Sequence, residues 1–174
     1  MSGAAVASAR AAIDEASAWQ ALGHVLDPEV PVLSVLELGI VRGVSVDRGA
    51  VHVVVTPTYS GCPATEAIQN AVRAALLEAG ARTVHIELQY APAWTTDWIA
   101  PVAAEKLRRY GIAPPHTVAR DAHTHTLHFH PRDVPCPRCK SANTERLSEF
   151  GSTACKSLYR CLACREPFDY FKPI

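Results

Sequence analysis

The spacing of apolar and polar residues predicts six elements before residue 112. Helices are expected where apolar residues recur every three or four positions, over residues 9–25, 63–79 and 95–111. Strands are expected where β-branched residues gather between turn signals, at "GIVRGVSVD" (39–47), "AVHVVVT" (50–56) and "RTVHIELQY" (82–90). The short turn around Gly49 makes the first two strands a hairpin. The expected order is α-β-β-α-β-α, which places this part of the chain in the α/β (α+β) class.

A cysteine, Cys62, stands where the second strand gives way to the second helix, in "TPTYSGCPATEAIQNAV" (56–72). A position at or next to a helix N-cap brings a side chain close to unpaired amide donors and to the positive end of the helix dipole. Both favour a thiolate over a thiol, so Cys62 is a candidate nucleophile or soft-metal ligand. The alternative is a small, partly buried cap residue, because no second cysteine or histidine near it in the sequence completes a catalytic pair.

The amino-acid composition changes after Gly111, where the segment "IAPPHTVARDAHTHTLHFHPRDVP" is rich in proline and histidine. We therefore expect an N-terminal domain over 1–115, a linker over 116–131 and a small module over 132–174. In an extended chain the linker histidines form two pairs, one on each face: His123 with His125, and His128 with His130. Each pair could bind a metal weakly, but a solvated linker needs none, and we favour the linker interpretation.

The small module carries two CxxC pairs separated by twenty-one residues: Cys136 with Cys139, and Cys161 with Cys164. Two such pairs allow four thiolates to converge tetrahedrally on one ion, so we expect a zinc ribbon. Iron or an Fe–S cluster is the alternative occupant, because thiolate ligation alone does not identify the metal. A module of this size buries too little apolar surface to fold without such help.

Two further features of the small module need an interpretation. Cys155 is a fifth thiol, interpreted as a small residue of the ribbon hairpin or, alternatively, as a replacement ligand or transient metal-transfer site. The segment "EPFDYFKPI" places Phe168, Tyr170 and Phe171 close together, and surplus aromatic residues often mark interfaces. We expect these aromatic side chains to form a surface for a client protein; packing against the N-terminal domain is the alternative.

Composition narrows the class of protein. Seventeen basic and seventeen acidic residues cancel, which argues against a nucleic acid partner. The Ala-rich N-terminus includes Asp14 and Glu15 and has no long apolar run, so we expect neither a signal peptide nor a membrane span, and a cytoplasmic location. Hydrophobic residues make up 48% of the chain, enough for a globular core. Homo-oligomerisation is left open.

Four segments together resemble the small α/β domain of the iron–sulfur assembly family, which includes SufT and the eukaryotic cytosolic targeting factors. They are "LDPEVPVLSVLELGIVRGVSV", "VTPTYSGCPATEAI", "TTDWI" and "KLRRYGIAPP". The tail that begins at Cys136 resembles the PaaD (PaaJ) family, the D proteins of bacterial phenylacetate-degradation clusters. The resemblance covers nearly the whole chain from about Trp19.

The resemblance implies a site and a role. Cys62 is implied to be a functional thiol for cluster or metal transfer, with Asp27 and Glu29 beside it and Thr56 and Thr58 as neighbours. The implied role is an accessory one in the phenylacetyl-CoA 1,2-epoxidase system, assisting iron or Fe–S maturation of the oxygenase or reductase. The implied partners are those two components and the iron–sulfur assembly machinery.

Two other functions compete with the maturation role. The first is a non-catalytic structural or regulatory subunit of the oxygenase. The second is a thiol enzyme, such as a thioesterase, with Cys62 as its nucleophile. The oxygenation itself is not expected of this chain, because it has no Glu-x-x-His pairing for a di-iron bundle, no ferredoxin-type cysteine spacing and no glycine-rich dinucleotide loop.

Overall fold

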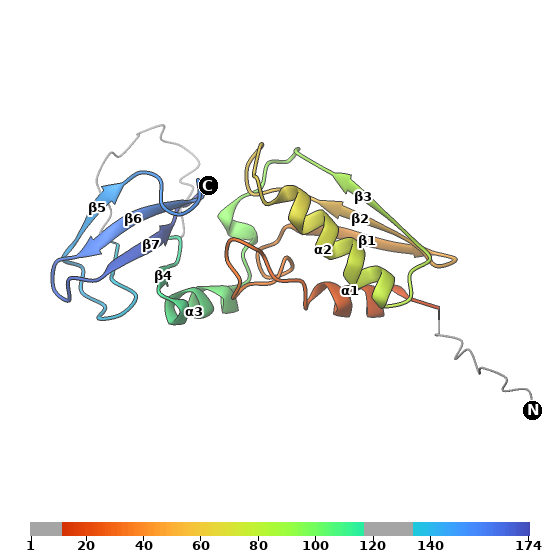
Figure 1. The fold of residues 1–174 in the computed structure, drawn as a ribbon, viewed down its shortest axis with the longest axis horizontal. Coiled ribbons are helices and arrows are strands. Elements are labelled where there is room, and N and C mark those ends of the chain that lie inside the picture. Colours follow the sequence, from red (N-terminus) through yellow and green to blue (C-terminus); the bar gives the residue numbers. More distant parts are fainter. Residues whose placement is uncertain (1–11, 117–133) are drawn as a thin grey trace, which may run out of the picture.

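The computed structural model describes residues 12–116 and 134–174 (Figure 1). The first part of the helix expected over 9–25 lies outside these ranges, as does nearly all of the expected linker with its four histidines, His123, His125, His128 and His130. Within the described ranges, no helix is long and apolar enough to cross a membrane.

The N-terminal module is a three-stranded sheet with two helices on one face (Figure 1). Its elements are α1 (Glu15–Leu22), β1 (Val41–Asp47), β2 (Ala50–Val55), α2 (Thr65–Glu78), β3 (Thr83–Leu88), a 3-10 turn η1 (Thr96–Trp98) and α3 (Pro101–Tyr110). Strand β2 lies in the middle, antiparallel to β1 and parallel to β3. The expected α-β-β-α-β-α order and the fold class are confirmed.

Local sequence explains the hairpin and the core of this module. Arg48 and Gly49 both have positive φ, 47° and 83°, as a two-residue turn that matches the twist of a hairpin requires. Alternate residues of β2 are buried, as are residues four apart on α2, so the two elements share one core. The buried residues are Val51, Val53 and Val55 of β2, and Ile68, Val72 and Leu76 of α2.

The second helix begins later than the sequence indicated. Its N-cap is Ala64, and no side chain caps it. Cys62 lies two residues earlier, in a turn where its N–H donates to the Tyr59 carbonyl at 3.3 Å and its carbonyl accepts from Thr65 at 3.1 Å. The expectation that Cys62 stands at or next to the N-cap is wrong, because this extra turn separates the strand from the helix.

The ribbon module is a four-stranded sheet, and one of its strands comes from the chain before the expected linker. Its strands are β4 (Ile112–Ala113), β5 (Thr144–Ser148), β6 (Lys156–Cys161) and β7 (Pro167–Phe171), in the order β4-β7-β6-β5. Strand β4 follows α3 directly and pairs with β7 in parallel. The chain therefore enters the ribbon sheet as soon as α3 ends.

The ribbon packs against the N-terminal module through Phe171, which is 1% exposed and belongs to the N-terminal core. Its ring centroid lies 6.2 Å from that of Trp94. Phe168 and Tyr170 are also buried, in the ribbon's own small core. The expectation that these three aromatic residues form a client surface is wrong, because the N-terminal module and the ribbon core bury them.

Replacing Phe171 with Ala should lower the free energy of unfolding by about 3 to 5 kcal/mol, the range for removing a buried aromatic ring. Because the ring belongs to a core shared by both modules, amide hydrogen exchange should accelerate in both. Urea denaturation followed by tryptophan fluorescence gives the first quantity, and exchange mass spectrometry gives the second.

Phe150→Ala is the matched control for this substitution. Phe150 is 64% exposed, and its ring meets Lys172 Nζ at 4.6 Å from the centroid. Its loss should cost less than about 1 kcal/mol, the scale of an exposed cation–π contact. Equal effects of the two substitutions would contradict a shared core built on Phe171.

Candidate functional site

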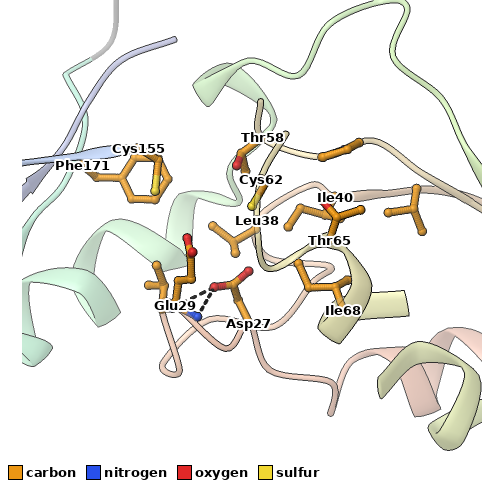
Figure 2. Close-up of a pocket in the computed structure, with 13 residues that line it drawn as sticks. Asp27, Glu29, Leu38, Ile40, Thr58, Cys62, Thr65, Ile68, Cys155 and Phe171 are labelled. Atoms are coloured by element: carbon orange, nitrogen blue, oxygen red, sulfur yellow. Dashed lines mark hydrogen bonds between the residues drawn. The ribbon is translucent and has the colours of Figure 1, made fainter. Parts of the chain in front are cut away.

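A pocket lies at the junction of the two modules (Figure 2). The N-terminal module supplies two carboxylates from the loop after α1 and a thiol from the loop between β2 and α2, while the ribbon supplies a second thiol and an aromatic ring. The lining residues that carry these groups are Asp27, Glu29, Cys62, Cys155 and Phe171. The floor is apolar and comes from the N-terminal core, with Leu38, Ile40, Val55 and Ile68.

Asp27 shapes the loop that forms one wall of the pocket. Its Oδ1 accepts hydrogen bonds from the N–H groups of Glu29 and Val30, both at 2.8 Å, which holds the loop in a tight turn. Burial raises the pKa of the Asp27 carboxyl, while the two amide donors and the nearby charge of Lys156 oppose that rise. The side chain is thus fixed in place close to the pocket.

Glu29 adds a second carboxylate on the same loop. Burial, and then the charge of Asp27, raise the pKa of Glu29, while Lys156 lowers it. Lys156 comes from the ribbon, and its Nζ donates to the Glu29 carbonyl at 3.2 Å. Nothing local in the sequence singles out Lys156, because its partner lies in the other module.

Cys62 lies in the opposite loop beside Tyr59. Burial, and then the charge of Cys62 and the hydrogen bond to its sulfur, raise the pKa of Tyr59 to about 12. Tyr59 therefore keeps its proton at neutral pH and can donate to the Cys62 sulfur. Sequence reasoning missed this neighbour, although Tyr59 stands within the same "TPTYSGCP" segment.

The two threonines expected near Cys62 separate in the structure. Thr58 lines the pocket with Cys62. Thr56 is not a lining residue: it is buried, and within the described part of the chain its Oγ1 has no hydrogen-bond partner. The N–H of Thr56 donates to the Ile40 carbonyl at 2.8 Å, which extends the sheet pairing by one residue.

Cys155 lies in this pocket, away from the four CxxC cysteines. It is 4% exposed, and the Thr153 hydroxyl lies 3.0 Å from its sulfur. Burial raises the pKa of the Cys155 thiol, and the contact with Thr153 lowers it. The sequence signal for Cys155 was its position outside both CxxC pairs, but nothing local placed it in the same pocket as Cys62.

The pocket is small. Its cavity volume is about 10 Å³, close to the minimum that holds one water molecule. A space of this size admits nothing larger than a water molecule or a single ion, and two thiols and two carboxylates lie beside its apolar floor. It does not suit an organic substrate, since pockets for such ligands measure roughly 300 to 1,000 Å³.

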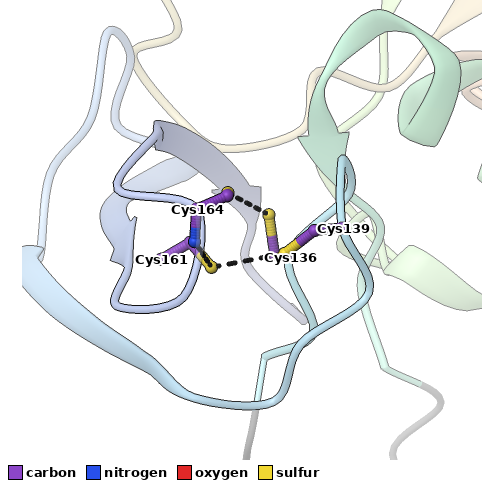
Figure 3. Close-up of side chains that lie close together, drawn as sticks. All are labelled: Cys136, Cys139, Cys161 and Cys164. Carbon is purple, nitrogen blue, oxygen red and sulfur yellow. Dashed lines mark hydrogen bonds between the residues drawn. The ribbon is translucent and has the colours of Figure 1, made fainter.

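The four CxxC cysteines form a separate cluster in the ribbon (Figure 3). Their sulfur atoms all lie within 4.8 Å of one another, with Cys136 and Cys164 3.8 Å apart and Cys139 and Cys161 3.5 Å apart. Tetrahedral zinc with Zn–S bonds of about 2.3 Å requires sulfurs roughly 3.8 Å apart. The cluster therefore has the geometry to hold one metal ion.

Backbone amides support this cluster. The Cys164 N–H lies 3.4 Å from the Cys161 sulfur. This hydrogen bond, opposed by burial, lowers the pKa of Cys161 to about 7. A thiolate is the form that binds metal, so the ribbon backbone favours the binding form of this ligand.

Two protein-family models match the chain. One, described as "Iron-sulfur cluster assembly protein", matches residues 15–108, and the other, described as "PaaD zinc beta ribbon domain", matches residues 120–172. The first match spans the module with Cys62, and the second spans all four clustered cysteines and Cys155.

Individual proteins are also similar to the chain. An Escherichia coli K12 protein, named as a putative subunit of 1,2-phenylacetyl-CoA epoxidase, is 52% identical over 157 residues, covering 90% of this chain and 91% of its own. The Bacillus subtilis "Fe-S protein maturation auxiliary factor YitW" is 34% identical over 79 residues, 44% of this chain and 76% of its own. A solved conserved hypothetical protein from Thermotoga maritima is 30% identical with a TM-score of 0.48, covering 55% of this chain and 94% of its own.

Through both of its modules, the chain belongs to the PaaD family, in which an iron–sulfur cluster assembly domain precedes a zinc β-ribbon.

Proposed function

We propose that this protein is an accessory factor of a phenylacetyl-CoA epoxidase system that helps to load iron or an Fe–S cluster into the oxygenase or the reductase component. The observation that carries the proposal is the ion-sized pocket in which the Cys62 thiol faces the loop of Asp27 and Glu29. The names of two relatives, an epoxidase subunit and an Fe–S maturation factor, support it. Cys62 supplies the labile thiolate, and the iron–sulfur assembly machinery supplies the cargo.

The pocket does not support a thioesterase. A nucleophilic cysteine needs a base within hydrogen-bond reach and space for the acyl group. No histidine is among the lining residues in the described part of the chain, and the neighbour of Cys62 is a tyrosine that keeps its proton. The cavity of about 10 Å³ leaves no room for an acyl chain.

In this proposal the ribbon metal is a structural zinc ion, bound by Cys136, Cys139, Cys161 and Cys164. The fit of the four sulfur atoms to a tetrahedron supports zinc. A closed set of four protein ligands leaves no open position, which is typical of a structural site. Its role is to fold the ribbon, and so to hold Phe171 and Cys155 against the N-terminal module.

A stable, non-catalytic subunit of the oxygenase is the second candidate, and the name of the Escherichia coli relative favours it. Co-purification separates the two functions. A subunit should remain with the oxygenase at a fixed ratio through size-exclusion chromatography. A maturation factor should be recovered in less than stoichiometric amounts, and its absence should lower the iron content of the purified oxygenase or reductase.

Cys62→Ser should abolish maturation while leaving the fold and the ribbon zinc intact. A serine hydroxyl stays protonated near neutral pH and binds soft metals poorly, and α2 does not depend on a side-chain cap. In cells that carry only the variant, the iron content of the affected component and growth on phenylacetate should fall by roughly tenfold or more. Iron analysis of the purified components measures the effect directly.

Ser60→Ala is the matched control, because Ser60 is exposed on the same loop and does not line the pocket. It should behave as wild type. Cys62→Ala repeats the test without adding a buried hydroxyl. Fully loaded components in cells with either Cys62 variant would contradict the maturation role and favour the stable-subunit function.

Loss of a group that only supports a metal ligand lowers metal affinity roughly 10- to 100-fold. Cys161→Ser removes a ligand itself, so zinc affinity should fall by more than that. Since metal binding and ribbon folding are coupled, residues after 134 should also become sensitive to protease. Competition with a chromophoric chelator measures the affinity. Cys155→Ser is the matched control, because it makes the same change in the same module but outside the cluster, and it should keep wild-type zinc affinity. The four-cysteine site would be contradicted if Cys155→Ser lost zinc, or if Cys161→Ser kept it.

A further inference from the structure

Cys62 is shielded from solvent in the observed arrangement. It is 9% exposed, and the pocket that it lines has a volume of about 10 Å³. That space holds a water molecule, but it does not admit a side chain of another protein. Passing iron or a cluster from one protein to another brings ligands of both proteins to the metal. The proposed function therefore requires a more open arrangement than this one.

The groups that line the pocket are not gathered around one point. Within residues 12–116 and 134–174, the four ribbon cysteines are the one group of three or more potential ligands close enough together to hold an ion. The floor of the pocket is apolar and belongs to the N-terminal core. The observed arrangement thus covers Cys62, and binding cargo requires the covering groups to move.

The ribbon supplies the wall that covers Cys62. Cys155 and Phe171 line the pocket from the ribbon side (Figure 2). The opposite side, with Cys62, belongs to the N-terminal module. Cys62, Cys155 and Phe171 are buried together in one apolar core. Moving the ribbon away would therefore uncover both thiols at the same time.

The contacts that hold this wall come from the start of β6 and the end of β7. The ring of Phe171 is buried in the N-terminal core. Lys156 is 3% exposed, and its Nζ donates to the Glu29 carbonyl at 3.2 Å. The Ile174 carbonyl accepts from the Thr96 N–H at 3.2 Å. The other helices and strands make their broad contacts within their own module, so a small set of side chains holds the ribbon on the pocket.

The ribbon has the means to stay folded and attached while these contacts break. Its own core contains Phe168 and Tyr170, and a metal ion held by its four clustered cysteines would support its fold. Strand β4 belongs to both modules, because Ile112 is buried in the N-terminal core and Ala113 in the ribbon core. Strand β4 can therefore join the modules while β6 and β7 move away from the pocket.

We propose that the ribbon is a lid on the pocket of Cys62, which opens to let a donor or a client protein reach the thiol. The inference rests on the maturation role proposed above, and it gives the ribbon a task beyond folding around its metal. Opening moves Phe171 and Cys155 away from the N-terminal module and exposes Cys62 with its apolar floor. The closed form protects Cys62 between transfers, because oxidation of a cysteine depends on its exposure.

Alkylation of the native protein tests the lid, because Cys62 and Cys155 lie on opposite sides of the junction. Zinc-loaded wild-type protein is treated with iodoacetamide at several urea concentrations below the unfolding transition, and peptide mass spectrometry measures each cysteine separately. Dividing each rate by the rate in unfolded protein gives an opening constant. The two cysteines should share one opening constant, roughly tenfold or more above that of global unfolding. It should depend less on urea, since partial opening exposes less surface.

Three results would each overturn the lid. Cys62 that reacts only through global unfolding would show that the ribbon stays on the pocket. Cys62 that reacts as fast as in unfolded protein would show that the ribbon does not protect it. Cys62 that reacts without Cys155 would show that the loop of Cys62 moves by itself.

A variant gives a second readout. Phe171→Ala should raise the opening constants of Cys62 and Cys155 by roughly tenfold or more, because it removes the main buried group of the wall, with zinc still at one per chain. Phe150→Ala, the exposed aromatic residue of the same module, is the matched control and should leave both constants unchanged. Unchanged constants in Phe171→Ala would overturn the lid. So would a rise that has the full urea dependence of unfolding, because only global stability would then have fallen.

The experiment also separates this inference from the proposed function. If Cys62→Ser abolishes maturation but the two wild-type thiols open only through global unfolding, the maturation role stands and the lid fails. If the two thiols open together below the unfolding transition but both Cys62 variants mature their clients normally, the lid stands and the maturation role fails.

Discussion

The burial of Phe171 in the N-terminal core is the interaction on which the rest of the structure depends. The ring lies at the end of β7, an inner strand, so its position fixes that end of the ribbon sheet against the loops after α1 and β2. A buried aromatic ring contributes several kcal/mol, more than the single hydrogen bond between Lys156 and Glu29. Without this contact the pocket would lose its ribbon wall and the thiol of Cys155.

The ribbon places its cysteines in two different settings. Four sulfurs lie close to tetrahedral spacing, with a backbone amide directed at one of them, which favours a permanently bound ion. Cys155 shares a pocket with Cys62 but has no such preformed shell. In the proposed function the first setting maintains the fold, and the pocket of the second contains Cys62, whose thiolate handles the cargo.

Two interpretations failed for the same reason. The aromatic residues of "EPFDYFKPI" were interpreted as a surplus because a small module cannot bury them alone, yet the N-terminal module buries Phe171. Cys62 is expected at or next to the helix N-cap because the strand and helix patterns almost meet there, yet a turn from Tyr59 to Cys62 separates them and the N-cap is Ala64. In both cases the local pattern is correct, but a feature outside it decides the outcome. For Phe171 that feature is the N-terminal module, and for Cys62 it is an irregular turn.

The sequence by itself determined the element order, the hairpin at Arg48 and Gly49, and the four clustered cysteines. These features depend on periodicity, turn chemistry and ligand spacing, which act over a few residues or through a repeated motif. Only the tertiary structure decided that Cys155, Lys156 and Phe171 meet Cys62, Asp27 and Glu29 at one junction. Such a meeting depends on how two modules dock, and docking is set by the shape and burial of whole surfaces, which no short stretch of sequence encodes.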